Sequence, residues 1–120
     1  MGMGGLARNP SVLVVEDEVL IRLAVADHLR QCGFEVHECG SADEARKVFL
    51  AGERIDIVFS DVNMPGPRDG IELAMWVEAN YPHAVMILTS GVQDALRSAG
   101  DACRNVRHFV EKPYQPSAVE

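Results

Sequence analysis

The sequence predicts an α/β fold, in which a parallel β-sheet carries helices on both faces. Short apolar runs alternate with segments of helical periodicity five times along the 120 residues, a pattern typical of parallel sheets. Two of the runs, residues 55–59 and 84–88, are apolar with Asp56 as the one exception and lack strict alternation, as is typical of strands buried on both faces. No repeat or linker divides the chain, so one domain is expected over residues 11–120, after a flexible lead-in over residues 1–10.

Composition excludes several classes of protein. Hydrophobic residues make up 48% and charged residues 24%, which is typical of globular chains. The net charge of −7 argues against nucleic-acid binding through this domain, and no apolar run approaches the roughly 20 residues that cross a membrane. Three cysteines occur without paired spacing, Cys32, Cys39 and Cys103. This odd number predicts reduced thiols and a cytoplasmic protein.

The first predicted strand covers residues 11–15 and ends at the acids Glu16-Asp17-Glu18. Apolar side chains then recur at steps of three and four as far as Cys32, which predicts an amphipathic helix, and Gly33 is suited to ending it. His28 lies on the same apolar stripe. A partly buried, hydrogen-bonded histidine is expected there rather than a ligand.

A second, shorter strand is predicted over residues 34–39, and its polar alternation is typical of an edge strand. Ser41 and Glu44 have the spacing of a capping box, which predicts a helix through Leu50. The chain therefore begins with two strand–helix units.

The third strand, residues 55–59, ends just before Asp61, and the turn dipeptide Pro65-Gly66 prevents its continuation. Gly70 leads into a third helix, which ends at residues 80–82. Asp61 therefore lies at the carboxyl end of a buried strand, where ligands of open α/β sheets bind.

The fourth strand, residues 84–88, ends at Thr89. The segment 92–103 contains Gly100 and has few residues to bury, Ala95, Leu96, Ala99 and Ala102. A short, weakly held helix is expected there.

A fifth strand is predicted over residues 107–110 and is followed by Lys112 and Pro113. The fifth helix has only a beginning at Pro116-Ser117, so the last helix is expected to be truncated. Apolar surface is then left bare, which favours either excision from a longer protein or cover from a partner.

Polar side chains follow four of the predicted strands, Glu16, Asp17, Asp61, Thr89 and Lys112. They are expected to share one crevice at the carboxyl edge of the sheet. Three carboxylates repel one another unless a cation neutralises them, and Mg²⁺ prefers oxygen ligands of this kind. A lysine and a hydroxyl beside them suit a phosphoryl group, and a carboxylate can be the nucleophile that receives it.

Each of these residues also has a purely structural interpretation. Asp17 suits the cap of the first helix, Thr89 is a common strand residue, and Lys112 suits a solvated surface. Their occurrence together at separate strand ends favours a shared site.

Four motifs, in this order along the chain, resemble the receiver domains of two-component response regulators. They are Val14-Val15-Glu16-Asp17-Glu18, Ser60-Asp61-Val62-Asn63-Met64-Pro65-Gly66, Leu88-Thr89-Ser90 and Glu111-Lys112-Pro113. Each motif is short, but the combination is specific, and the resemblance extends over about residues 11–116. It implies a flavodoxin-like, doubly wound sheet of five strands in the order 2-1-3-4-5.

The resemblance also implies roles at the site. Asp61 would be the phosphoacceptor, supplied by a histidine kinase or a histidine phosphotransfer protein. Glu16 and Asp17 would hold Mg²⁺ together with Asp61 and the backbone carbonyl of Asn63.

Further roles follow from the same resemblance. Lys112 would contact a phosphoryl oxygen, and Thr89 would be the switch hydroxyl, coupled to the aromatic residue Phe109. The side chain of Asn63 and residue Gly91 match positions that tune the lifetime of the phosphorylated state.

The chain departs from the family pattern in three places. The loop after Asp61, with Gly66-Pro67-Arg68 inserted, is one residue longer than the commonest family form. The span from Thr89 to Lys112 is also about one residue longer, and the fifth helix is nearly absent. Dimerisation and output contacts made in the family by the last elements are therefore in question, and the oligomeric state stays open.

Two other functions are considered. A pseudo-receiver that binds partners without phosphate would be expected to lack at least one of the site residues. A Mg²⁺-dependent aspartyl phosphohydrolase would carry a second aspartate where this chain has Asn63. We therefore expect no enzyme activity beyond Mg²⁺-dependent self-phosphorylation and self-dephosphorylation, with a hybrid sensor kinase as the favoured parent protein.

Overall fold

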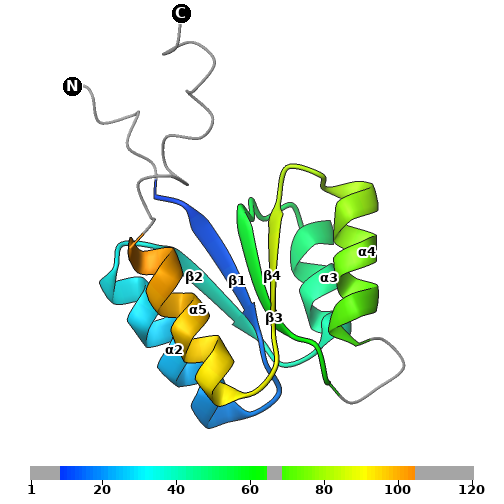
Figure 1. Cartoon of the computed structure of the whole chain (residues 1–120). Helices are drawn as coiled ribbons and strands as arrows, with labels where there is room; N and C mark the ends of the chain where they lie inside the picture. The colour runs from blue at the N-terminus through cyan, green and yellow to red at the C-terminus, as the bar shows by residue number, and fades with distance from the viewer. Residues whose placement is uncertain (1–8, 65–68, 105–120) are drawn as a thin grey trace, which may run out of the picture.

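A single parallel sheet with two helices on each face forms the described part of the chain (Figure 1). The structure is a computed structural model and describes residues 9–64 and 69–104. Its elements are β1 (Ser11–Val15), α2 (Val19–Gln31), β2 (Glu35–Cys39), α3 (Ala42–Leu50), β3 (Ile57–Asp61), α4 (Gly70–Asn80), β4 (Val85–Thr89) and α5 (Val92–Arg104). All strand pairs are parallel, and the strand order is β2-β1-β3-β4.

The two sheet faces bury separate cores because alternate residues of each strand point to opposite sides. On one face, Val12 and Val14 of β1 pack with α2 and α5, and on the other, Leu13 and Val15 pack with α3 and α4. Figure 1 shows the two helix pairs on opposite sides of the sheet. The prediction that the third strand is buried on both faces is confirmed, since Ile57 to Ser60 are all buried.

The predicted strand order is confirmed for four strands, with β2 at an edge of the sheet as expected. The fifth strand predicted over residues 107–110 lies outside the described residues. So do Pro116-Ser117, where the last helix was expected to begin, and residues 1–8 of the expected lead-in.

Two expectations about the second half of the chain are wrong. The helix expected to be short is α5, which has 13 residues, because its buried alanines let it lie close against α2.

The cysteines are not all reduced. Cys32 and Cys103 form a disulfide, although 71 positions separate them, because the fold brings the carboxyl ends of α2 and α5 together. Cys39 is free and buried, and burial raises the pKa of its thiol to about 12.

Local signals place the helix ends. Ser41 accepts a hydrogen bond from the backbone N–H of Glu44, so the predicted capping box is confirmed at its first half. Glu44 reaches back to the backbone N–H of Gly40, one residue before the cap. Gly33 has a φ of 101°, a left-handed conformation that favours glycine after a helix. Among the described residues, no helix has the length and apolar character needed to cross a bilayer.

Aromatic packing between α3 and α4 gives a first prediction. Phe49 is buried, and its ring centroid lies 4.6 Å from that of Tyr81 and 5.9 Å from that of Trp76. Phe49→Ala removes this packing and leaves a cavity, so the free energy of unfolding should fall by about 3–5 kcal/mol. Urea unfolding followed by circular dichroism measures the change.

The neighbouring exposed residue is the control for this prediction. Leu50 is 67% exposed on the same helix, so Leu50→Ala should change stability by no more than about 0.5 kcal/mol. Equal effects of the two substitutions would contradict the assigned core.

Candidate functional site

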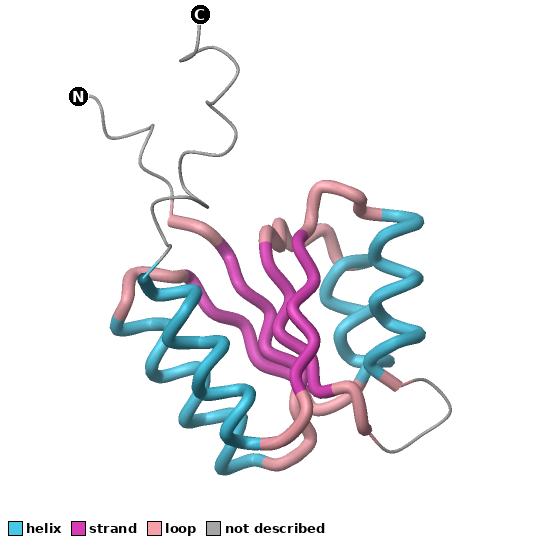
Figure 2. The backbone as a smooth tube through the Cα atoms, viewed as in Figure 1, coloured by secondary structure: helices cyan, strands magenta, loops and turns pink. Residues whose placement is uncertain are grey.

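The acids predicted to converge lie together at the carboxyl edge of the sheet. Glu16 and Asp17 follow β1, and Asp61 ends the neighbouring strand β3. One carboxylate oxygen from each of the three lies within 4.8 Å of the others. Figure 2 shows that the loops leaving β1, β3 and β4 lie at the same end of the sheet, the lower end in this view.

Glu16 is the most constrained of the three acids. It is only 7% exposed, and its Oε2 accepts a hydrogen bond of 2.9 Å from the backbone N–H of Glu18. Its backbone carbonyl accepts a hydrogen bond from Arg22 of α2. Burial raises the pKa of the Glu16 carboxyl above its ordinary value of 4.5, and the nearby charges of Asp61 and Asp17 raise it further. A negative charge at this position is therefore unfavourable unless a cation compensates it.

Asp61 and Asp17 are more accessible. Asp61 is half-buried, and its Oδ1 accepts a hydrogen bond of 3.2 Å from the backbone N–H of Asn63. Asp17 is exposed and lies two residues before α2, whose N-cap is Glu18. The purely structural interpretation of Asp17 as the helix cap is therefore wrong.

Thr89 lies beside Asp61 on the next strand. The two residues are partners in the parallel register of β3 and β4, and the carbonyl of Thr89 accepts a hydrogen bond from the backbone N–H of Val62. Thr89 is 5% exposed. The hollow that Asp61 and Thr89 line together with Ala95 of α5 has a volume of only about 10 Å³. A hollow of this size holds at most about one water molecule, so a reacting group must approach Asp61 from the solvent side.

Gly70, predicted from the sequence only to lead into a helix, lies against the backbone of Asp61. A Cβ atom at Gly70 would lie 2.2 Å from the backbone carbonyl oxygen of Asp61 and 2.9 Å from Cα of Val62. The start of α4 is fixed by Asp69, whose Oδ1 accepts hydrogen bonds from the backbone N–H groups of Ile71 and Glu72. A sequence signal for this contact exists in hindsight, since an Asp-Gly pair opens the helix that follows Asp61.

Other predicted site residues lie outside the described part of the chain. They are Phe109, Lys112 and the inserted loop residues Gly66, Pro67 and Arg68. Their roles stay predictions.

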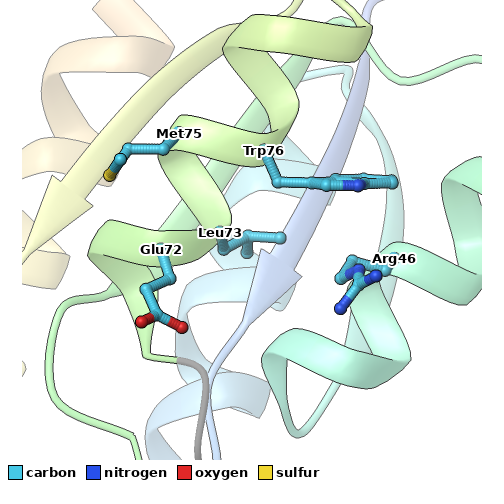
Figure 3. A pocket seen from close by; sticks show the side chains of 5 residues that line it. All are labelled: Arg46, Glu72, Leu73, Met75 and Trp76. Atoms are coloured by element: carbon cyan, nitrogen blue, oxygen red, sulfur yellow. The ribbon is translucent and has the colours of Figure 1, made fainter.

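A larger hollow lies elsewhere, between α3 and α4 (Figure 3). It has a volume of about 330 Å³ and is lined by Arg46, Glu72, Leu73, Met75 and Trp76. The guanidinium carbon of Arg46 lies 5.2 Å from the centre of the Trp76 ring. Because it contains none of the clustered acids, the hollow is not part of the candidate site.

The raised pKa of Glu16 gives a prediction about pH. Glu16 binds its proton more tightly in the folded chain than in the unfolded chain. The free energy of unfolding therefore falls as the pH rises from the ordinary pKa of Glu16 to its raised pKa, and at higher pH this loss stays constant. Glu16→Gln removes this penalty and keeps an oxygen for the N–H of Glu18. Without metal, the variant should therefore be more stable than the natural chain at pH 7, with a difference that disappears at acidic pH.

Thermal unfolding in EDTA across this pH range tests the prediction. Glu18→Gln changes an exposed neighbour and should alter stability by no more than about 0.5 kcal/mol. A natural chain more stable than Glu16→Gln at pH 7 would show that the Glu16 charge is favourable.

Comparison with known proteins gives a consistent family. The family model of the response regulator receiver domain matches residues 12–120. The response regulator protein FleR of Pseudomonas aeruginosa is 34% identical over 108 residues, which cover 90% of this chain and 22% of FleR. The transcriptional regulatory protein PdtaR of Mycobacterium tuberculosis is 38% identical over 109 residues, covering 88% of this chain and 51% of PdtaR. The sensor kinase CckA of Brucella abortus is 39% identical over 88 residues, covering 72% of this chain and 9% of CckA. The chain thus spans about half or less of these relatives.

Solved structures share the fold. A response regulator receiver domain protein from Clostridium thermocellum has a TM-score of 0.72 at 22% identity, covering 88% of this chain and 98% of that chain. The response regulator TrrA from Thermotoga maritima, in complex with Mg²⁺-BeF, has a TM-score of 0.63 at 33% identity, covering 68% and 69%. A complex of the histidine kinase ThkA with TrrA matches with a TM-score of 0.63 at 32% identity and the same coverage.

Proposed function

The chain belongs to the response regulator receiver domain family, and from that premise we propose that Asp61 accepts a phosphoryl group in a Mg²⁺-dependent reaction. The observation that carries the proposal is the convergence of three carboxylates from two strands within 4.8 Å. Asp61 is the accessible strand-end member, while Glu16 is buried and held by its own hydrogen bonds.

The donor set fits Mg²⁺. It offers only oxygen ligands, two of them on accessible side chains, which suits a small, hard cation that keeps several waters. Burial and the neighbouring charges of Asp61 and Asp17 raise the pKa of Glu16, which supports a site where a cation would stabilise the charged carboxylates. Glu16, Asp17 and Asp61 would hold the ion, with the backbone carbonyl of Asn63 as a further ligand. When bound, Mg²⁺ supplies positive charge that screens the phosphoryl oxygens from these carboxylates.

The residues of the chain then have distinct tasks. An Asp61 carboxylate oxygen forms the new bond to phosphorus as the bond from phosphorus to its donor breaks. Thr89 is the register partner of Asp61 on the neighbouring strand, which supports a role for its hydroxyl as a hydrogen-bond donor to the added group. Lys112 would contribute a positive charge, and Phe109 would fill space that Thr89 leaves. This is a shift between two packings of the same domain.

The partner that donates the phosphoryl group is a histidine kinase or a histidine phosphotransfer protein. The structurally similar regulator TrrA forms a complex with the histidine kinase ThkA, which supports the first of these. The parent protein is a separate question, because the relatives include two regulators and a sensor kinase. We favour a hybrid sensor kinase as the parent protein, and the full reading frame of the gene tests this. We also favour a cytoplasmic location.

Incubation with acetyl phosphate tests the proposal. In the presence of Mg²⁺, intact-mass spectrometry should show one added phosphoryl group, lost on raising the pH because acyl phosphates hydrolyse. EDTA should prevent the addition. A chain that stays unlabelled at every Mg²⁺ concentration, while remaining folded, would support the pseudo-receiver instead.

A turnover assay separates the receiver from an aspartyl phosphohydrolase. The receiver hydrolyses only its own phosphoryl group, so steady-state release of phosphate from phosphomonoesters should be absent. Sustained turnover would favour the hydrolase, although Asn63 lacks the acidic proton that this reaction requires.

A further inference from the structure

A covalent link joins the two helices that cover one face of the sheet. Cys32 caps the carboxyl end of α2, Cys103 lies in the last turn of α5, and their Sγ atoms are bonded. The Cα atoms are 5.5 Å apart, a separation that a disulfide spans without moving the backbone. Figure 1 shows α2 and α5 side by side, with their carboxyl ends at the same end of the pair.

The noncovalent contact of α5 with α2 is made by small side chains. Its buried residues are three alanines, Ala95, Ala99 and Ala102. They pack in the same core cluster as Val25 and Leu29 of α2. The larger apolar residues of α5, Val92 and Leu96, are each 44% exposed. Because an alanine buries little apolar area, the disulfide between Cys32 and Cys103 is expected to contribute much of the stability of the carboxyl end of α5 against local unfolding.

The surroundings suit thiol chemistry at this pair and not at the third cysteine. Cys32 and Cys103 are partly exposed, whereas Cys39 is buried with a pKa of about 12 and is therefore unreactive. A ring nitrogen of His28, one helical turn before Cys32, lies within 4.8 Å of both sulfur atoms. His28 is exposed, contrary to the sequence-based expectation.

We propose that Cys32 and Cys103 are a reversible redox pair that small disulfides such as oxidised glutathione close, and that the closed pair clamps α5 to α2. In the first step, one cysteine thiolate attacks oxidised glutathione, forms a mixed disulfide and releases one glutathione thiolate. In the second, the other cysteine thiolate attacks the protein sulfur of that mixed disulfide and displaces the second glutathione. Two protein thiols and one oxidised glutathione thus give the protein disulfide and two reduced glutathiones. His28 is a nearby acceptor for the thiol protons.

The two helices joined by the disulfide begin close in sequence to residues of the phosphoryl site. The helix α5 begins at Val92, three residues after Thr89, and α2 begins at Val19, two residues after Asp17. The disulfide joins the carboxyl ends of α2 and α5. It therefore restrains α5, the helix that follows Thr89 and adjusts when Thr89 moves. This consequence, unlike the redox pair itself, rests on the proposed function of Asp61.

Equilibration of the whole chain in glutathione buffers tests the pair. After alkylation under native conditions, intact mass should show two alkylated cysteines at reducing ratios and none at oxidising ratios, with Cys39 unlabelled throughout. Hydrogen exchange of α5 amides should be roughly tenfold or more faster in the reduced form. Cys39→Ser should keep both responses, whereas Cys103→Ser should exchange like the reduced chain in either buffer.

Three outcomes overturn the proposal. Thiols that stay free in pure oxidised glutathione exclude the pair, and α5 exchange that is unchanged on reduction excludes the clamp. Stoichiometric Zn²⁺ binding to the reduced chain that blocks oxidation would make His28, Cys32 and Cys103 a metal site instead. Acetyl phosphate labelling of both redox forms keeps the two proposals separate. An unlabelled chain that still closes the disulfide contradicts only the role of Asp61, and a labelled chain that never closes it contradicts only the redox pair.

Discussion

Asp61→Asn is expected to take up no phosphoryl group from acetyl phosphate at any Mg²⁺ concentration. A neutral amide lacks the anionic oxygen that attacks phosphorus, so the loss should be complete rather than partial. The substitution preserves the shape of the side chain, and the amide oxygen of asparagine can still accept a hydrogen bond from the backbone N–H of Asn63. The fold should therefore survive, and intact-mass spectrometry of folded protein measures the loss directly.

The same variant should also bind Mg²⁺ less tightly. Removing one of three carboxylates takes away a ligand and relieves part of the repulsion that raises the pKa of Glu16. A fall in affinity of roughly tenfold is expected, measured by a Mg²⁺ titration in a competition assay. Unchanged Mg²⁺ binding would mean that the ion site does not include Asp61.

Asp56→Asn is the matched control, because Asp56 lies just before β3, at the opposite end of the strand. Its carboxylate accepts a hydrogen bond from the backbone N–H of Ser11 and forms an ion pair with Arg54. Asparagine keeps an oxygen that can accept the hydrogen bond from Ser11. Labelling by acetyl phosphate should be the same as in the natural chain. Labelling that survives Asp61→Asn and disappears in Asp56→Asn would move the phosphoacceptor to the other end of the strand.

The site was predictable to the extent that it follows from strand direction. Parallel strands end at one edge, so acids after the first and third strands had to approach one another, and the structure brings Glu16 and Asp17 to Asp61. The buried central strand followed from its apolar run, and the edge position of β2 followed from its polar alternation. What local patterns specify well is the direction and burial of each element.

Contacts between the helices α2 and α5 were not predictable. The disulfide joins positions 71 apart, and no spacing rule finds such a pair before the helices have been placed. The length of α5 was underestimated for a related reason. Alanines that looked like a deficient core are a close-packing surface against Val25 and Leu29, and only the presence of α2 reveals this.

Gly70→Ala is expected to have the second largest effect on the site, although Gly70 carries no chemistry. A methyl group there would overlap the backbone carbonyl of Asp61, and backbone atoms cannot turn aside as a side chain can. Either α4 or the end of β3 must shift. The free energy of unfolding should fall by about 1–3 kcal/mol or more, as for other overpacked sites. Labelling should slow by roughly a hundredfold, since a displacement of about 1 Å costs that much at a reacting centre.

Gly100→Ala separates this close approach from a general effect of replacing glycine in a helix. Gly100 lies inside α5, where an added Cβ would meet only a guanidinium nitrogen of Arg104 at 3.7 Å, an ordinary contact. Alanine is the better helix former, so this variant should be more stable by about 0.5–1 kcal/mol and should be labelled at the natural rate. Chemical unfolding and acetyl phosphate labelling of both variants give the comparison. If Gly70→Ala also gains stability and keeps its labelling rate, the start of α4 does not press on Asp61, and the loop between them positions the carboxylate without help from the helix.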